Sequence, residues 1–262
     1  MEEQNSPAWQ PPPPPEKIEA PEAAEMSEAA TLGSIFFEPG RTFEDLRRKP
    51  RFVIAGLIIL IVLSIFNFAF IQRLGYERIV RDRMEANPRV QQMPADQKEQ
   101  IISQQSGPIW KTIGYAAPVI GVALVIFVGG LIYWLGANAV GGSANYLQGV
   151  SVWVYSWFPP FVVAMIANFI ILYLKAPEDI DIMTSQGGLI HASPSMLIDA
   201  RAQPVLNALL GSLDLFSIWG WILAAIGLRI VAKISSGAAW AVVLIWALVG
   251  VAAKVVGALF FG

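Results

Sequence analysis

The chain alternates between long apolar runs and shorter polar stretches. Five of these runs are 20 to 25 residues long: 52–71, 113–136, 150–174, 205–228 and 240–259. At 1.5 Å per residue, a helix needs about 20 residues to cross the ~30 Å hydrocarbon layer of a bilayer. The pattern therefore predicts an all-α polytopic membrane protein with five transmembrane helices.

The composition supports this fold class and narrows the chemistry. Of the 262 residues, 55% are hydrophobic and 15% are charged, whereas soluble domains carry about 25% charged residues. The chain has no cysteine and one histidine, so Cys-ligated zinc and His-cluster metal sites are excluded. A net charge of −2 does not suggest binding to nucleic acid. A phosphate-binding loop of the GxxxxGK[ST] type is absent, and we expect neither a catalytic site nor a cofactor.

The first 32 residues differ in composition from the rest. Five prolines at 11–15 favour polyproline II, and the acidic stretch that follows has few large apolar residues to bury. We predict a disordered tail over 1–32 and a membrane domain over 33–262. A docking site for a proline-binding domain is the alternative interpretation of the proline run.

The segment SIFFEPGRTFEDLRRKPRF, residues 34–52, predicts a short amphipathic interfacial helix before the first span. Thr42 and Asp45 have the spacing of a capping box. Arg47 and Arg48 lie near the helix end, where cations and anionic headgroups are both favourable. The expected apolar anchors in the bilayer are Phe36, Phe37, Phe43 and Leu46.

Two further features interrupt the simple pattern. Between the first two spans, Glu77 precedes Arg81 by four residues, and Pro94 starts a second polar helical segment. This spacing predicts a small helical hairpin outside the bilayer. In the third span, Pro159 and Pro160 should kink or interrupt the helix.

Asp214 and Lys254 are charged residues inside the fourth and fifth predicted spans. Each lies 14 residues, or about 21 Å, from the end of its span at the short connecting turn. Matched depth on neighbouring antiparallel helices suggests a structural ion pair. Two alternatives stay open: a proton or ion pathway, and an Asp214 cap on a helix that begins at Leu215 after a break at Gly211.

The distribution of basic residues predicts the orientation. Five bases lie within the eleven residues 41–51, just before the first span, and two more lie in the final turn. Because bases close to spans favour the inner side, we expect a cytoplasmic amino terminus.

Three segments resemble one known family. FEPGRTFEDLRRKP before the first span, YSWFP in the third, and LDLFSIWGWILAAIGL in the fourth are similar to the Yip-one domain family of Ypt/Rab GTPase-interacting membrane proteins, in its bacterial branch. The likeness covers about 33–262. It implies five spans, a cytoplasmic amino-terminal tail, residence in a bacterial inner membrane and no known catalytic site. Eukaryotic relatives act in vesicle traffic and membrane shaping and bind prenylated small GTPases.

Two classes of function follow. The first is a non-enzymatic membrane scaffold that acts through lipid contacts and through membrane or cytoplasmic protein partners. The second is a small transporter or channel that uses Asp214 and Lys254. Small residues four apart, such as Gly220 and Ala224, favour close helix packing and leave homo-oligomerisation open.

Overall fold

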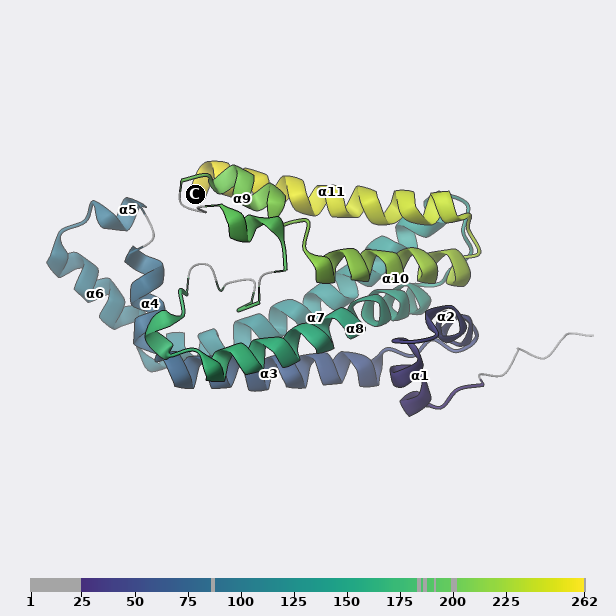
Figure 1. Ribbon diagram of the computed structural model, residues 1–262, viewed down its shortest axis with the longest axis horizontal. Coiled ribbons are helices and arrows are strands. Elements are labelled where there is room, and N and C mark those ends of the chain that lie inside the picture. The colour runs from purple at the N-terminus through teal and green to yellow at the C-terminus, as the bar shows by residue number, and fades with distance from the viewer. Residues whose placement is uncertain are drawn as a thin grey trace, which may run out of the picture.

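The computed structural model describes residues 25–85, 88–182, 185, 188–190, 192–198 and 202–261, and every regular element in this part of the chain is helical (Figure 1). The four long helices are α3 (Val53–Leu74), α7 (Pro108–Ala139), α8 (Tyr146–Leu174) and α11 (Ser236–Phe261). The shorter α-helices are α1 (Glu28–Ser34), α2 (Pro39–Arg48), α4 (Tyr76–Glu85), α5 (Pro88–Gln91), α6 (Ala95–Gln105), α9 (Pro204–Leu210) and α10 (Leu215–Val231). Two single-turn 3-10 helices, η1 (Pro177–Asp179) and η3 (Pro194–Leu197), follow α8.

The four long helices are each apolar and long enough to cross a membrane. The pair α9 and α10 makes a fifth span if the two count together, and they are bent by 44° at their break. The predicted polytopic all-α class is therefore confirmed. The predicted span over 205–228 is divided, because the chain leaves the helical conformation between Leu210 and Leu215, as the alternative with a break at Gly211 required.

Two ends of the elongated bundle can be distinguished. We call the α2 end the one that holds α2, the start of α8 and the end of α10. There the backbone N–H of Ser143 donates to the carbonyl oxygen of Ala232 at 3.0 Å, so the turns beside α8 and α10 lie at one level. We call the opposite end the hairpin end. Figure 1 shows α4, α5 and α6 there.

The predicted hairpin outside the span region is confirmed at the hairpin end. Arg81 of α4 donates to both carboxylate oxygens of Glu99 in α6, at 3.1 and 3.2 Å. Arg78 donates to the carbonyl oxygens of Pro177 and Ile180, at 2.7 and 3.2 Å. The hairpin is thus tied to the segment that follows α8. A small apolar cluster lies beneath it: Ile71, Leu74, Ile79, Leu172, Ile180, Ile182 and Leu189.

Prolines inside the spans do not end them. Pro118 lacks the N–H that would bond the carbonyl of Gly114, and Asn67 of α3 donates its amide to the oxygens of Gly114 and Tyr115 at 3.2 and 3.1 Å. A neighbouring helix therefore satisfies the freed carbonyl, as the bilayer interior requires. Pro159 and Pro160 are both buried within α8, which continues through them, so they do not interrupt the third span.

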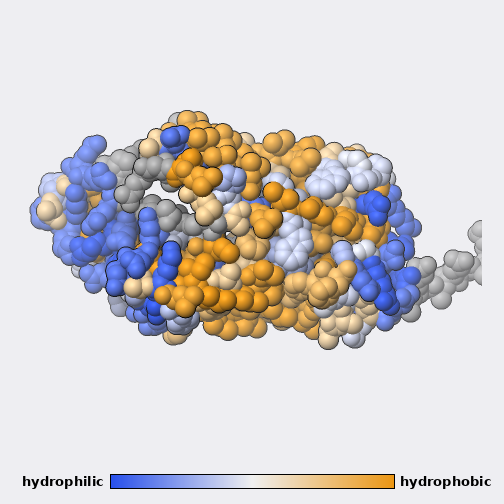
Figure 2. Space-filling view, viewed as in Figure 1, coloured by the Kyte–Doolittle hydropathy of each residue, from blue (hydrophilic) through white to orange (hydrophobic). Residues whose placement is uncertain are grey.

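The main core lies between α7, α8, α10 and α11 toward the α2 end. Glycines allow α7 and α8 to approach closely. A Cβ at Gly129 would lie 2.1 Å from the ring of Trp153, and one at Gly130 would lie 2.4 Å from Val150. Outward-facing apolar side chains such as Ile61, Leu124 and Leu248 cover the middle of the body. Figure 2 shows this apolar belt between polar ends.

Candidate interaction site at the α2 end

α1 and α2 form a bent helical unit against the α2 end of the bundle. Ser27 caps α1 by accepting a hydrogen bond from the N–H of Ala30 at 3.2 Å. Pro39 is the first residue of α2, where its missing N–H costs nothing. α1 begins inside the segment 1–32 that we predicted to be a disordered tail. The Ser27 cap and the burial of Thr31 stabilise this helix. Residues 1–24 of the predicted tail lie outside the described part of the chain.

α2 packs one face against the bundle. Its buried residues are Thr42, Phe43, Asp45 and Leu46, which lie three and four positions apart on one side of the helix. Phe43 fits against Gly227 of α10. A Cβ at Gly227 would lie 2.8 Å from the Phe43 ring and 2.9 Å from Val152 of α8. Glycine at this position therefore makes the notch that seats α2.

This packing corrects the predicted direction of the anchors. Phe43 and Leu46 are fully buried in the protein core, so they do not face the bilayer. The predicted capping box is also wrong. Thr42 donates its hydroxyl to the carbonyl of Glu38 at 3.0 Å from inside the helix, and α2 begins four residues earlier than that motif implied. The apolar face of α2, which we predicted to contact lipid, packs against the protein core instead.

The most buried charges at this end are Asp45 and Arg51. Their side chains are 3% and 6% exposed and form an ion pair. The second carboxylate oxygen of Asp45 accepts hydrogen bonds from the backbone N–H groups of Glu25 and Met26, at 2.6 and 3.1 Å. Arg51 donates to the carbonyl of Met26 at 2.6 Å. We call this arrangement the clamp. It holds the backbone of residues 25 and 26, whatever side chains they carry.

Hydroxyl groups extend the polar contacts around the clamp. Thr31 is fully buried and accepts a hydrogen bond from Arg51 at 3.3 Å. The hydroxyls of Ser34 in α1 and Thr42 in α2 are 2.9 Å apart. These contacts satisfy polar groups that would otherwise be costly to bury. They also fix the angle between α1 and α2.

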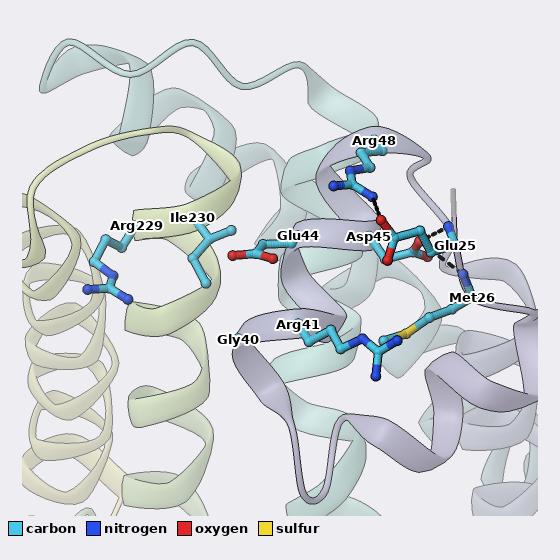
Figure 3. A pocket seen from close by; sticks show the side chains of 9 residues that line it. All are labelled: Glu25, Met26, Gly40, Arg41, Glu44, Asp45, Arg48, Arg229 and Ile230. Carbon is cyan, nitrogen blue, oxygen red and sulfur yellow. Dashed lines mark hydrogen bonds and ion pairs between the residues drawn. The ribbon is translucent and has the colours of Figure 1, made fainter. Parts of the chain in front are cut away.

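A polar cleft opens beside the clamp (Figure 3). Its volume is about 500 Å³, and it is lined by Glu25, Met26, Gly40, Arg41, Glu44, Asp45, Arg48, Arg229 and Ile230. Arg48 forms an ion pair with Glu25, and Arg41 forms one with Glu38 at 3.3 Å. Both signs of charge are present, which suits a polar polypeptide surface better than an apolar small molecule.

The two predicted headgroup-facing arginines contact protein. Arg48 pairs with Glu25, as described above. The backbone carbonyl of Arg47 accepts a hydrogen bond from the side chain of Gln148 at 2.8 Å, which joins α2 to the capped start of α8. Arg47 thus helps to attach α2 to the bundle, and Arg48 attaches α2 to the segment before α1.

Asp214 caps α10 at its start, whereas Arg229 and Ile230 of the cleft lie at the end of the same helix. Its carboxylate accepts hydrogen bonds from the N–H groups of Phe216 and Ser217, at 3.0 and 3.1 Å. This is the geometry of the cap alternative, with the helix beginning at Leu215. Lys254 is exposed on α11. Among the residues that the structure describes, no ion pair joins Asp214 to Lys254.

Sequence reasoning missed the clamp. Asp45 and Arg51 are six residues apart, with Pro50 between them, so no helical spacing relates them. The available signal was an acid on the apolar side of an amphipathic segment, next to Phe43 and Leu46. A charge there needs a buried partner, and two bases outside the helix, Lys49 and Arg51, follow within six residues.

The comparisons with known proteins agree with the fold. The Yip1 domain family model matches residues 33–256, so the chain belongs to this family. It is also similar to the membrane protein YknW of Bacillus subtilis (strain 168), with 28% identity over 218 residues, which cover 82% of this chain and 84% of that protein. No solved structure matches the chain.

Proposed function

We propose that the protein is a non-catalytic scaffold of the bacterial inner membrane. Its α2 end would face the cytoplasm and present the amino-terminal segment to protein partners. The observation that carries this proposal is the clamp, in which a buried ion pair holds the backbone of Glu25 and Met26 beside an open polar cleft. A scaffold needs such a fixed junction between its membrane domain and its displayed segment.

The orientation rests on charge. Bases at 41, 47, 48, 49 and 51 lie at the α2 end, where Arg229 is in the last turn of α10 and Lys233 is in the turn after it. This distribution is typical of the cytoplasmic side. A reporter that is active only in the cytoplasm, fused after Gly262, tests the assignment. Activity at that end would place the amino terminus outside and overturn it.

Capture of partners in native lipid tests the scaffold role. We expect the full chain to retain a defined set of proteins that is lost when residues 1–24 are removed, and reduced when Arg41 and Glu44 in the cleft are reversed in charge. Arg83→Glu, an exposed change at the hairpin end, is the matched control. Identical partner sets in all four proteins would contradict the proposal.

A small transporter or channel is the second candidate. The observation in its favour is the break between α9 and α10, with a 44° bend and Asp214 at the start of the second half-helix. Half-helix ends form substrate sites in many transporters. Flux in proteoliposomes that Asp214→Ala abolishes would support this candidate over the scaffold.

A further inference from the structure

The turn between α1 and α2 is displaced along the bundle axis, from the α2 end toward the middle of the bundle. Phe36 packs edge-on against Phe158 of α8 and Trp219 of α10, with ring centroids 6.1 and 6.5 Å apart. Both partners are 12 residues inside their helices, counted from Tyr146 and Val231, or about 18 Å along each axis. Figure 1 likewise shows α1 set back from the end of α10 along the long axis of the bundle.

α1 has an inner and an outer face of different chemistry. Thr31, Leu32 and Ile35 face the protein core. The exposed positions within α1 are Ala29, Ala30 and Gly33, and those of the turn are Phe37 and Glu38. The exposed positions within α1 carry no charge, Phe37 is 88% exposed, and Glu38 forms an ion pair with Arg41 of α2. By contrast, the exposed positions of α2 include Arg41 and Glu44, as expected for a surface in water.

Two of the spans also expose apolar side chains. Val53 and Leu57 at the start of α3 are 59% and 51% exposed, and Ile218 and Ile222 on α10 are 37% and 42% exposed. These residues belong to helices that cross the membrane, so lipid acyl chains cover them. Phe36, the neighbour of Phe37, packs against Trp219, which follows Ile218 on α10, and this contact brings Phe37 close to the lipid-covered surface of α10.

We infer that α1 and its turn insert into the membrane leaflet at the α2 end, with Phe37 as the anchor among the upper acyl chains. Interfacial helices bury their apolar face about 5–10 Å into the headgroup–acyl boundary. The clamp and the contact between Ser34 and Thr42 hold α1 at this depth. The partner is a phospholipid leaflet, and the inference does not depend on the proposed scaffold function.

Site-directed fluorescence tests this insertion directly, because the chain has no cysteine. Phe37→Cys is labelled with an environment-sensitive dye in proteoliposomes that contain phosphatidylcholine with a nitroxide at acyl carbon 5 or 12. Glu44→Cys is the aqueous control. Leu248→Cys on α11, 65% exposed and 12 residues from Ser236, is the deep lipid control. Gel filtration checks that each protein is folded.

We expect the label at position 37 to be quenched several-fold more by the carbon-5 nitroxide than the label at position 44. It should be quenched less by the carbon-12 nitroxide than the label at position 248, and it should resist aqueous iodide. Iodide quenching equal to that at position 44 would overturn insertion. Protection from both lipid and aqueous quenchers would also overturn it, since protein would then cover Phe37.

Discussion

Asp45 and Arg51 form an ion pair that is almost excluded from solvent, and each also binds the backbone of the segment before α1. Buried pairs depend on both members, because a single remaining charge is left without compensation. The pair joins three parts of the chain: α2, the link between α2 and α3, and residues 25 and 26. Its loss should therefore disturb more than one contact.

Single changes at the clamp should destabilise the protein. Asp45→Met or Arg51→Met leaves an unpaired buried charge, and we expect each to cost about 3–5 kcal/mol of unfolding free energy. The double change removes both charges and should cost less than the sum of the two. Unfolding by SDS titration in lipid–detergent micelles measures all three. Strictly additive effects would contradict the clamp.

Gly227 should tolerate no side chain while Phe43 is present. Gly227→Ala places a Cβ 2.8 Å from the Phe43 ring, and overpacking of this kind costs about 1–3 kcal/mol. Adding Phe43→Leu should return part of that loss. Gly250→Ala is the matched control, because a Cβ there meets nothing within 4 Å. The same SDS titration compares them, and equal effects at the two glycines would disprove the notch.

Variants at Asp214 distinguish a helix cap from an ion pair with Lys254. We expect Asp214→Ala to cost about 1 kcal/mol as a lost helix cap, and Asp214→Asn to retain most of the stability because asparagine also caps well. Lys254→Met should be neutral or slightly stabilising. An ion pair predicts instead that Asp214→Asn and Lys254→Met cost similar amounts and that the charge swap restores the loss. Stabilities of the four variants decide between them.

Asn67 should matter because of a proline on another helix. Its amide donates to the carbonyl that Pro118 leaves free. Hydrogen bonds between membrane helices contribute about 0.6 kcal/mol on average and up to about 1.7, so we expect a cost in this range for Asn67→Leu. The cost should fall when Pro118→Ala restores the helical bond. A cost that is unchanged in the Pro118→Ala background would refute the coupling.

The hairpin should respond to acid. Hydrogen bonds from Arg81 lower the pKa of Glu99 below its ordinary value of 4.5. A lowered pKa in the folded state means that the contact stabilises the hairpin above about pH 4.5 and that this contribution is lost as pH falls through the folded pKa.

Spin labels report on that contact. With cysteines at the exposed positions Arg83 and Gln104, the distance distribution between labels should be narrow at pH 7 and should broaden as the pH falls through the lowered pKa of Glu99. Glu99→Gln should broaden it already at pH 7. A distribution that does not change with pH would exclude a role for the pair.

Hydrophobic length was enough to predict the spans and the class of fold, because crossing a bilayer imposes a minimum apolar run. It could not predict the break at Gly211–Leu213, since a bent pair of helices has nearly the same composition as one straight helix. The sequence also could not predict whether Phe43 faces lipid or the protein core. An apolar residue suits lipid and protein core equally well, and only the notch at Gly227 decides between them. The hairpin could be predicted because Glu77, Arg81 and Pro94 give local signals in the sequence.

Unequal helix lengths have a consequence for the surrounding bilayer. α10 has 17 residues and α7 has 32, which correspond to about 25 and 48 Å at 1.5 Å per residue. α10 makes its span only together with the seven residues of α9, which are bent from it by 44°. Mismatch between a span and the bilayer is relieved by tilt or by local changes of thickness, so we expect the lipids beside this bent pair to be packed differently from those beside the single long helix α7.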